Sequence, residues 1–420
     1  MLIPQTSHRL FITLLLLSAL GACSTLEPQT TNTPPPSIPA CAPCSPCPSC
    51  PDTTPPLSKT PRYELKQIVK PAEFADLPGW LDDDVRKAWP GFLKSCDAFL
   101  KKSATSPWKR VCDLAKKVDR DELSAVREFY ETHFKPYRLF NPENQRHEGL
   151  ITGYYEPLLR GSRERSGDFQ TPALGIPDDL LTIDLSEVVP ELKNFRLRGR
   201  IEGNKVVPYA PRRDIVGKAG YRPDKDKVLL WVNDPVELFF LQIQGSGRVQ
   251  LPDGSQVRLG YADQNGHPYR SIGRVLIDRG DLKPEAASMQ GIQTWGRQHP
   301  DRLEALLNAN PSYVFFRELP AAAPEEGPPG ALGVPLTPER SLAIDPRTTP
   351  LGAPLYLATT YPNSNKPLNQ LMLGQDTGGA IRGIVRADFF WGFGRSAGEQ
   401  AGKMKQTGQL WVLLPEEAAP

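Results

Sequence analysis

Histidine is scarce in this chain, and its placement argues against a common class of metal site. The only histidines are His8, His133, His147, His267 and His299, and no two of them show paired ligand spacing. Zinc sites and facial-triad iron sites are built from such paired ligands. We therefore expect no bound metal.

Excess charge of one sign is also missing. Lysine and arginine total 50, aspartate and glutamate total 48, and the formal net charge is +2. Proteins that bind nucleic acid carry a clear basic excess, so we expect no nucleic-acid partner. The Gly-Ser-Gly at 245–247 lacks the lysine and the following helix of a phosphate-binding loop, which argues against nucleotide binding. We expect no cofactor.

The chain has no apolar run long enough to cross a bilayer, which takes about 20 residues. The run from Leu10 to Leu20 is shorter and ends in Leu-Gly-Ala before Cys23, an arrangement that resembles a bacterial lipoprotein cleavage site. We expect residues 1–22 to be a signal peptide and Cys23 to be lipidated. Because the residue directly after Cys23 is Ser24 and not an acidic residue, we place the chain at the periplasmic face of the outer membrane of a Gram-negative bacterium. An ordinary secretory signal with an incidental cysteine is the alternative.

Residues 23–61 are rich in proline, threonine and serine, and such a composition predicts an extended tether without a packed core. Cys41, Cys44, Cys47 and Cys50 lie within it, spaced superficially like iron–sulfur ligands. Their proline and serine neighbours offer no apolar shell, and the compartment is oxidising. Disulfides within or between chains are the better prediction, with the pairing left open.

The remaining 360 or so residues are enough for two domains of about 150 residues each. Apolar residues recur at three- and four-residue steps between Trp80 and Phe134, which predicts helices. Cys96 and Cys112 lie on the first two of these helices, joined by a short loop, so we predict a disulfide between them. Short apolar runs with many glycines and prolines predict mostly β structure in the rest, including strands at 149–159, 227–232 and 237–244.

Three aspartates end or interrupt apolar runs in the C-terminal region: Asp345, Asp376 and Asp388. Strands lying side by side could bring them together, and close or buried acids raise one another's pKa. An acid that stays protonated near neutral pH can donate a proton to a glycosidic oxygen. Glu156, before a proline, is a weaker candidate. The alternative is that Asp376 begins an ordinary turn and Asp388 is a solvated strand residue. Serine nucleophiles lack the required strand-turn-helix elbow.

Several motifs occur in a specific order and together resemble the family of membrane-bound lytic murein transglycosylase A. Besides the lipoprotein-like start they are Gly-Tyr-Tyr-Glu-Pro at 153–157, Gln-Ile-Gln-Gly-Ser-Gly at 242–247, Asn-Gly-His-Pro-Tyr-Arg-Ser-Ile-Gly at 265–273, Asn-Pro-Ser-Tyr-Val-Phe-Phe at 310–316, and Asp-Thr-Gly-Gly-Ala-Ile at 376–381. The resemblance extends from about residue 150 to the end. The proline- and cysteine-rich tether departs from the family pattern.

The resemblance implies a mostly β fold with a helical N-terminal part. In it a double-psi β-barrel domain, residues 62–156 and 309–416, is interrupted by a second, smaller β-barrel-like domain at 157–308. A groove between the two would bind glycan strands. The implied reaction is non-hydrolytic cleavage of the β-1,4 bond between N-acetylmuramic acid and N-acetylglucosamine in peptidoglycan, which leaves a 1,6-anhydro ring.

The catalytic acid implied by the resemblance is Asp376, acting first as acid and then as base, with Asp388 and Asp345 as supporting acids. Candidate glycan contacts are Tyr154, Tyr155, Gln244, Ser246, Tyr269, Gly378 and Gly379. The alternatives are a hydrolytic glycosidase on the same barrel and a non-catalytic murein-binding lipoprotein. Complexes of murein synthesis or hydrolysis are further candidate partners, along with the outer membrane through the lipid anchor.

Overall fold

The computed structural model describes residues 63–190, 192, 195, 197–216, 227–323 and 325–420. The predicted signal peptide, Cys23 and the four tether cysteines lie outside these ranges. Within the described ranges, no helix is both long and apolar enough to span a membrane.

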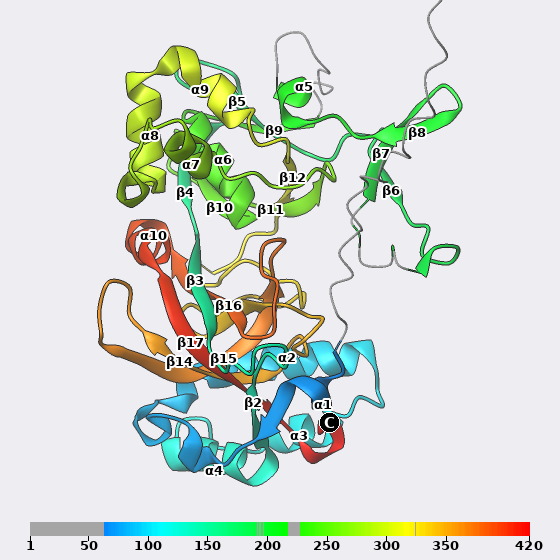
Figure 1. The fold of residues 1–420 in the computed structure, drawn as a ribbon, viewed down its shortest axis with the longest axis vertical. Coiled ribbons are helices and arrows are strands. Elements are labelled where there is room, and N and C mark those ends of the chain that lie inside the picture. The colour runs from blue at the N-terminus through cyan, green and yellow to red at the C-terminus, as the bar shows by residue number, and fades with distance from the viewer. Residues whose placement is uncertain (1–62, 191, 193–194, 196, 217–226, 324) are drawn as a thin grey trace, which may run out of the picture. The chain divides into compact units, whose positions relative to one another are not determined.

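A closed six-stranded β-barrel is the centre of the described fold (Figure 1). Its strands neighbour one another in the order β17-β14-β15-β13-β16-β3, and β3 pairs back with β17 to close the ring. The barrel strands are β3 (Gly149–Glu156), β13 (Ser341–Ile344), β14 (Pro354–Thr360), β15 (Pro367–Thr377), β16 (Arg386–Phe393) and β17 (Lys405–Leu414). The pairs β13–β15 and β16–β3 are parallel, and the other four pairs are antiparallel. This barrel and the helical N-terminal part confirm the predicted fold class.

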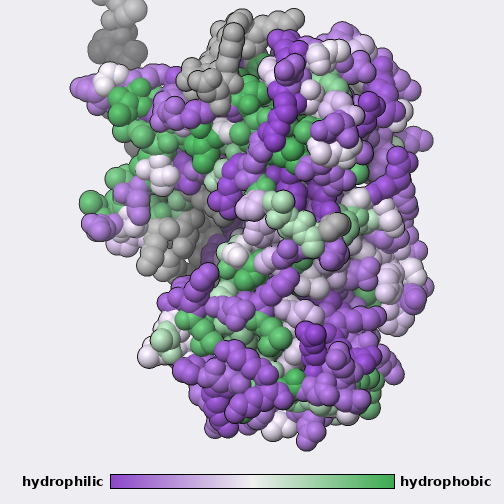
Figure 2. Space-filling model, turned by 180° about the vertical axis from the view of Figure 1, so that it is seen from behind, coloured by the Kyte–Doolittle hydropathy of each residue, from purple (hydrophilic) through white to green (hydrophobic). Residues whose placement is uncertain are grey.

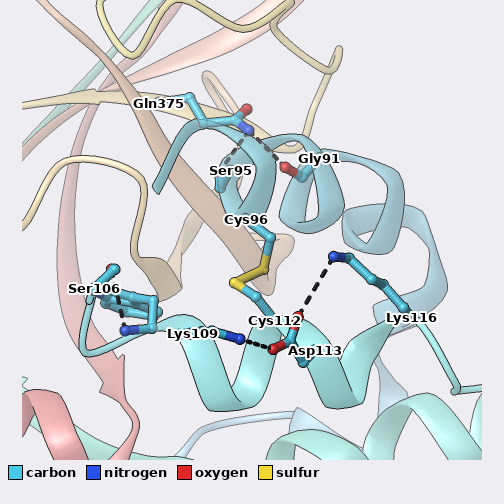
Figure 3. Close-up of a disulfide and its surroundings, with 10 residues drawn as sticks. Gly91, Ser95, Cys96, Ser106, Lys109, Cys112, Asp113, Lys116 and Gln375 are labelled. Carbon is cyan, nitrogen blue, oxygen red and sulfur yellow. Dashed lines mark hydrogen bonds and ion pairs between the residues drawn. A yellow bond between two sulfur atoms is a disulfide. The ribbon is translucent and has the colours of Figure 1, made fainter. Parts of the chain in front are cut away.

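Helices pack against the barrel and share its main apolar core. They are α1 (Leu65–Ile68), α2 (Trp89–Lys102), α3 (Lys109–Ala115), α4 (Leu123–His133) and α10 (Gly394–Lys403), and two further strands, β1 (Val69–Pro71) and β2 (Lys135–Leu139), extend the sheet beside β17. A disulfide joins Cys96 of α2 to Cys112 of α3, in agreement with the sequence-based prediction, with the Cα atoms 5.3 Å apart. Figure 3 shows this bond below the point where the barrel meets α2.

Gln375 fixes the end of β15 to α2. Its side-chain amide donates to the Gly91 carbonyl oxygen at 2.8 Å and to Ser95 Oγ at 3.0 Å, as Figure 3 shows. Its amide oxygen accepts from Ser341 Oγ at 2.7 Å. Gln375 is fully buried, so these bonds hold the backbone immediately before Asp376 in one position.

A second, six-stranded sheet follows the order β12-β11-β10-β4-β9-β5. Its strands are β4 (Leu158–Ser162), β5 (Thr171–Leu174), β9 (Val228–Val232), β10 (Ser246–Gln250), β11 (Gln256–Gln264) and β12 (Val314–Leu319). The helices of this part are α5 (Arg212–Val216), α6 (Pro235–Gln244), α7 (Ile272–Asp278), α8 (Met289–Gln298) and α9 (Pro300–Leu307). Because β12 pairs with β11, this sheet extends beyond residue 308. The two domain boundaries stay a prediction.

The strand predicted at 237–244 is wrong, because these residues form α6. Asp234 caps this helix by accepting from the backbone N–H groups of Val236 and Glu237, and Pro235 occupies its first turn. Both are helix-start signals. The helix buries apolar residues toward two separate core clusters, so its sequence lacks the polar face that would have marked it as helical.

A small sheet, β6-β7-β8, has two chemically different faces. Its strands are β6 (Leu181–Ile183), β7 (Leu197–Glu202) and β8 (Lys205–Pro208). Ile201 lies opposite Val206 on one face, and these side chains are 66% and 57% exposed. On the other face Arg198 pairs with Asp263 of β11 at 3.0 Å. In Figure 2, which shows the molecule from behind, hydrophobic and hydrophilic patches alternate over this region.

Candidate functional site

Two of the three predicted acids lie in one row across the barrel wall. Strand register places Asp376 of β15 opposite Ala343 of β13, and Ala343 opposite Asp388 of β16. Asp388 in turn lies opposite Thr152 of β3. Directly opposed residues project to the same face of a sheet, so all four side chains share one face.

This face packs in a small apolar cluster that is separate from the main core. Leu342 and Ile344, on either side of Ala343 in the strand, belong to the main core. Ala343 belongs instead to a separate small apolar cluster, with Tyr154, Leu336, Ile381 and Phe390. Because neighbouring strands lie about 4.8 Å apart, the Cα atoms of the two acids are separated by roughly 10 Å. In the register of the strands, Ala343 is the residue that lies between them.

Asp376 is half-buried and accepts hydrogen bonds on both carboxyl oxygens. The Tyr154 hydroxyl donates to Oδ2 at 3.0 Å, and the backbone N–H of Ala331 donates to Oδ1 at 2.9 Å. Burial raises the pKa of this carboxyl, and the hydrogen bonds from Thr377, Ala331 and Tyr154 oppose that rise only in part. A carboxyl with a raised pKa is suited to donate a proton and then take one back.

Asp388 has an even clearer shift, because burial raises its pKa to about 6. Thr152 Oγ1 donates to Oδ1 at 2.5 Å, and Arg386 Nη2 donates to the same threonine oxygen at 2.8 Å. Thr152 and Arg386 lower the pKa, while the charge of Asp376 raises it. Burial and both acids also raise the pKa of Tyr154 well above its usual value, which keeps its hydroxyl protonated. The two acids, Tyr154 and Thr152 thus form one coupled group.

The raised pKa of Asp388 predicts that removing its charge stabilises the fold at neutral pH. The folded chain holds this proton more tightly than the unfolded chain, whose carboxyl has a pKa near 3.8. Stability therefore falls as the pH rises from about 4 to about 6, and stays lower above that range. We expect Asp388→Asn to raise the free energy of unfolding by about 1 to 3 kcal/mol at pH 7 and to change it little at pH 4. Urea denaturation at both pH values measures this, and lower stability of the variant at pH 7 contradicts it.

Asp345 is buried away from this row. Its carboxylate accepts from Arg347 Nε and Nη2 at 2.9 and 2.6 Å, and from the backbone N–H of Gly383 at 2.9 Å. Burial acts to raise its pKa, but these hydrogen bonds outweigh burial and the pKa is lowered. Within the described residues, these partners belong to the turn that contains Asp345 and to the loop that follows Asp376. The supporting role predicted for Asp345 would therefore be to hold that loop in position.

The side chains of the two adjacent tyrosines of β3 contact different parts of the structure. Tyr154 contacts Asp376. Tyr155 packs against Gly398 of α10, where an added Cβ would lie 2.7 Å from its ring, and its hydroxyl lies 3.5 Å from Met289 Sδ. Both rings are at most 9% exposed. A glycan contact by either one stays a prediction.

The other predicted glycan contacts are spread over both sheets. The Gln244 side-chain oxygen accepts from the Tyr155 backbone N–H at 3.1 Å, and Ser246 begins β10 two residues later. Tyr269 is half exposed. Gly378 and Gly379 follow Asp376. A Cβ at Gly378 would lie 2.6 Å from Ile381, whereas one at Gly379 would meet open space. The roles of these residues in binding glycan stay predictions.

Sequence reasoning missed Thr152, Arg386 and the backbone N–H of Ala331. Thr152 lies two residues before Tyr154 on one strand, so alternation alone could have placed it on the same face. The contribution of Ala331 is a backbone group from a loop and leaves no signal in the side-chain pattern. Glu156 is fully buried and paired with Arg248 at 2.9 Å. Within the described ranges, no group of three or more histidine, cysteine, aspartate or glutamate side chains is placed to hold a metal.

Comparisons with known proteins agree with this architecture. Residues 150–317 match the MltA specific insert domain, and residues 340–414 match the 3D domain. Membrane-bound lytic murein transglycosylase A of Escherichia coli K12 is 36% identical over 270 residues, which are 63% of this chain. The chain spans 65% of the length of that curated relative.

Solved structures cover more of the chain. The crystal structure of MltA from Neisseria gonorrhoeae is 38% identical and has a TM-score of 0.70, covering 84% of this chain and 93% of that one. The crystal structure of E. coli MltA with bound chitohexaose is 28% identical and has a TM-score of 0.60, covering 79% of this chain and 90% of that one.

Proposed function

Because the chain belongs to the family of membrane-bound lytic murein transglycosylase A, we propose that it cleaves the glycan strands of peptidoglycan without water. The bond cut is the β-1,4 link between N-acetylmuramic acid and N-acetylglucosamine, and the product carries a 1,6-anhydro ring. The observation that carries this proposal is Asp376, a half-buried carboxyl with a raised pKa that lies beside a small apolar cluster.

Asp376 performs both proton transfers in this proposal. The protonated carboxyl donates to the leaving glycosidic oxygen, and positive charge develops at the anomeric carbon. The resulting carboxylate then takes the proton of the muramic 6-hydroxyl as that oxygen attacks the anomeric carbon. One carboxylate is enough because an internal hydroxyl replaces the water that an ordinary glycosidase activates with a second acid. Tyr154 and the Ala331 N–H steady the carboxylate between the two steps.

Asp388 favours a second candidate, a hydrolytic glycosidase. Its carboxyl lies in the same row, roughly 10 Å from Asp376 by strand spacing, and could activate a water molecule. Against this, Asp388 Oδ1 already accepts a hydrogen bond from Thr152, whose hydroxyl oxygen is itself held by Arg386.

One incubation with purified murein sacculi tests both candidates. The soluble products are read by mass, since an anhydro product is lighter by one water molecule than a hydrolysis product. Anhydro ends support the proposal, and reducing ends establish the hydrolase. Retention on sacculi with no soluble product would indicate a non-catalytic murein-binding protein.

We also propose a location in the cell envelope, since the curated relatives are named membrane-bound. Anchoring to the outer membrane through lipid on Cys23 is the finer proposal. Mass spectrometry of the mature N-terminus tests it, and an unmodified Cys23 contradicts it. We further propose that the chain associates with complexes of murein synthesis or hydrolysis. We also propose that glycan binds in a groove between the barrel and the second sheet.

A further inference from the structure

Loop 326–336, between β12 and β13, supplies one of the hydrogen bonds to Asp376. The tip of this loop lies against the end of β15. There the Ala331 N–H donates to Asp376 Oδ1 at 2.9 Å. The neighbouring Leu332 N–H donates to the Gln375 carbonyl oxygen at 3.0 Å. The position of this loop therefore decides whether the acid keeps one of its donors.

The base of loop 326–336 is held by two arginines of the second sheet. Arg258 Nη2, on β11, donates to the Gly327 carbonyl oxygen at 2.8 Å and to the Glu326 carbonyl oxygen at 3.2 Å. Arg248 Nη2, on β10, donates to the same Glu326 carbonyl oxygen at 3.1 Å. Hydrogen bonds from charged donors are stronger than those between neutral groups. Two cations of one sheet thus fix a loop that reaches the acid of the other.

The two arginines differ in what else they bind. Arg248 Nε donates to Glu156 at 2.9 Å, and Glu156 is fully buried, so replacing Arg248 would leave a buried charge unpaired. Arg258 is half-buried, and among the described residues its guanidinium donates only to the carbonyl oxygens of Glu326 and Gly327. The contribution of Arg258 to the loop can therefore be tested without breaking a buried ion pair.

The loop is stiff between its base and its tip. Pro328 and Pro329 directly follow the two carbonyl groups that the arginines hold, and proline fixes its own φ near −65°. The Leu336 N–H donates to the Pro328 carbonyl oxygen at 2.9 Å, which ties the two sides of the loop together. At the tip, a Cβ at Gly330 would lie 2.6 Å from the Gln375 carbonyl oxygen. A displacement of the base is therefore passed on to the contacts with β15.

We propose that Arg258 is a positioning residue for the reaction at Asp376, because it fixes loop 326–336 so that the Ala331 N–H stays on the carboxyl. This inference rests on the proposed function and adds a residue of the second sheet to the surroundings of the acid. The N–H stabilises the carboxylate, which is the form that Asp376 takes once its proton has gone to the leaving oxygen. Without Arg258 the Gly327 carbonyl group loses its donor, the loop shifts, and the carboxylate loses this N–H.

The pKa of Asp376, measured by NMR on the chain labelled with ¹³C at its aspartate carboxyls, tests this without any cleavage. The signal of Asp376 is identified by its loss in Asp376→Asn. Among the described residues, the titratable groups that face this carboxyl are Tyr154 of β3 and Asp388 of β16, and neither is bonded to Arg258. We expect Arg258→Met to raise the pKa by about one pH unit, because the charged form loses a hydrogen bond. An unchanged pKa in the folded variant overturns the proposal.

Further variants separate the loop from the charge. Arg317→Met removes an exposed arginine of β12, the strand beside β11, and should leave the pKa of Asp376 unchanged. Arg258→Lys keeps the charge and should raise the pKa less than Arg258→Met; it replaces that variant if the methionine chain does not fold. Gly330→Ala pushes the tip off β15 with every charge in place, and combining it with Arg258→Met should add little, because both act through one hydrogen bond. A shift in Arg317→Met, or full additivity of the other two, contradicts the proposal.

Cleavage of soluble murein glycan is compared second, at pH values where Asp376 is protonated. We expect Arg258→Met to lower kcat about three- to tenfold with KM nearly unchanged, and to move the alkaline limb of its pH profile to higher pH. A loss confined to KM contradicts the positioning role. If the pKa of Asp376 responds to Arg258 but the unmodified chain releases no anhydro product, the link between the two residues stands and the proposed function is overturned. Anhydro products beside an unresponsive pKa do the reverse.

Discussion

Asp376→Asn is expected to fold normally and to lower the release of anhydro-muropeptides from murein sacculi by at least about a thousandfold. The expected loss is large because one carboxyl supplies both the proton to the leaving oxygen and the base for the 6-hydroxyl. Asparagine fills almost the same volume and its oxygen still accepts from Tyr154 or Ala331, so the backbone of the site should not move. Product release measured by mass, with circular dichroism to check the fold, gives the result.

The matched control is Asp278→Asn, which removes a carboxylate from the exposed face of α7, where it pairs with Arg274. It should keep full activity. Asp388→Asn is the informative comparison within the site, since it leaves Asp376 in place. If Asp376→Asn retains activity while Asp388→Asn abolishes it, the assignment of acid and base is wrong and the second carboxyl performs the chemistry.

The sequence indicated which acids to examine but not which of them share a face. Asp376 and Asp388 end or interrupt apolar runs, and the register of β15, β13 and β16 does bring them into one row. Asp345 follows Ala343 by two residues, so simple alternation would put its side chain on the same face as the two other acids. The strand ends at Ile344, however, and Arg347 with the Gly383 N–H holds the carboxylate in a turn. Alternation fails there because a strand end depends on partners that are distant in sequence.

Local pattern was likewise insufficient for Tyr155 and for α6. Both adjacent tyrosines were candidate glycan contacts, but neighbouring strand residues face opposite ways, and only Tyr154 reaches the acid. The apolar run at 237–244 has helix-start signals at Asp234 and Pro235, but burial toward two clusters removed the periodic polar face that would have identified it. In both cases the local sequence does not show which side chains are buried by other elements, because tertiary contacts decide this.

The largest expected effect on stability comes from Arg340, which joins the N-terminal segment to the barrel. It is 5% exposed, and its partner Asp83 is 7% exposed. Arg340 Nη1 and Nη2 donate to the two Asp83 oxygens at 3.0 and 2.8 Å, and Nη1 also donates to the Leu371 carbonyl oxygen at 2.9 Å. The Leu371 N–H donates to Asp83 Oδ2 at 2.7 Å. The charges of Arg340 and Asp83 are therefore satisfied by each other together with the backbone groups of Leu371.

Arg340→Met is expected to lower the free energy of unfolding by about 3 to 5 kcal/mol, because it leaves the Asp83 carboxylate buried without its cation. Arg274→Met is the control, since Arg274 and Asp278 are 73% and 55% exposed and such pairs contribute at most about 1 kcal/mol. Replacing both buried partners, Arg340→Met with Asp83→Leu, should recover part of the loss, because no unpaired charge remains. Urea denaturation of the three variants measures these differences. A loss below about 1 kcal/mol for Arg340→Met would mean that water reaches Asp83 and that this contact does not hold the N-terminal segment to the barrel.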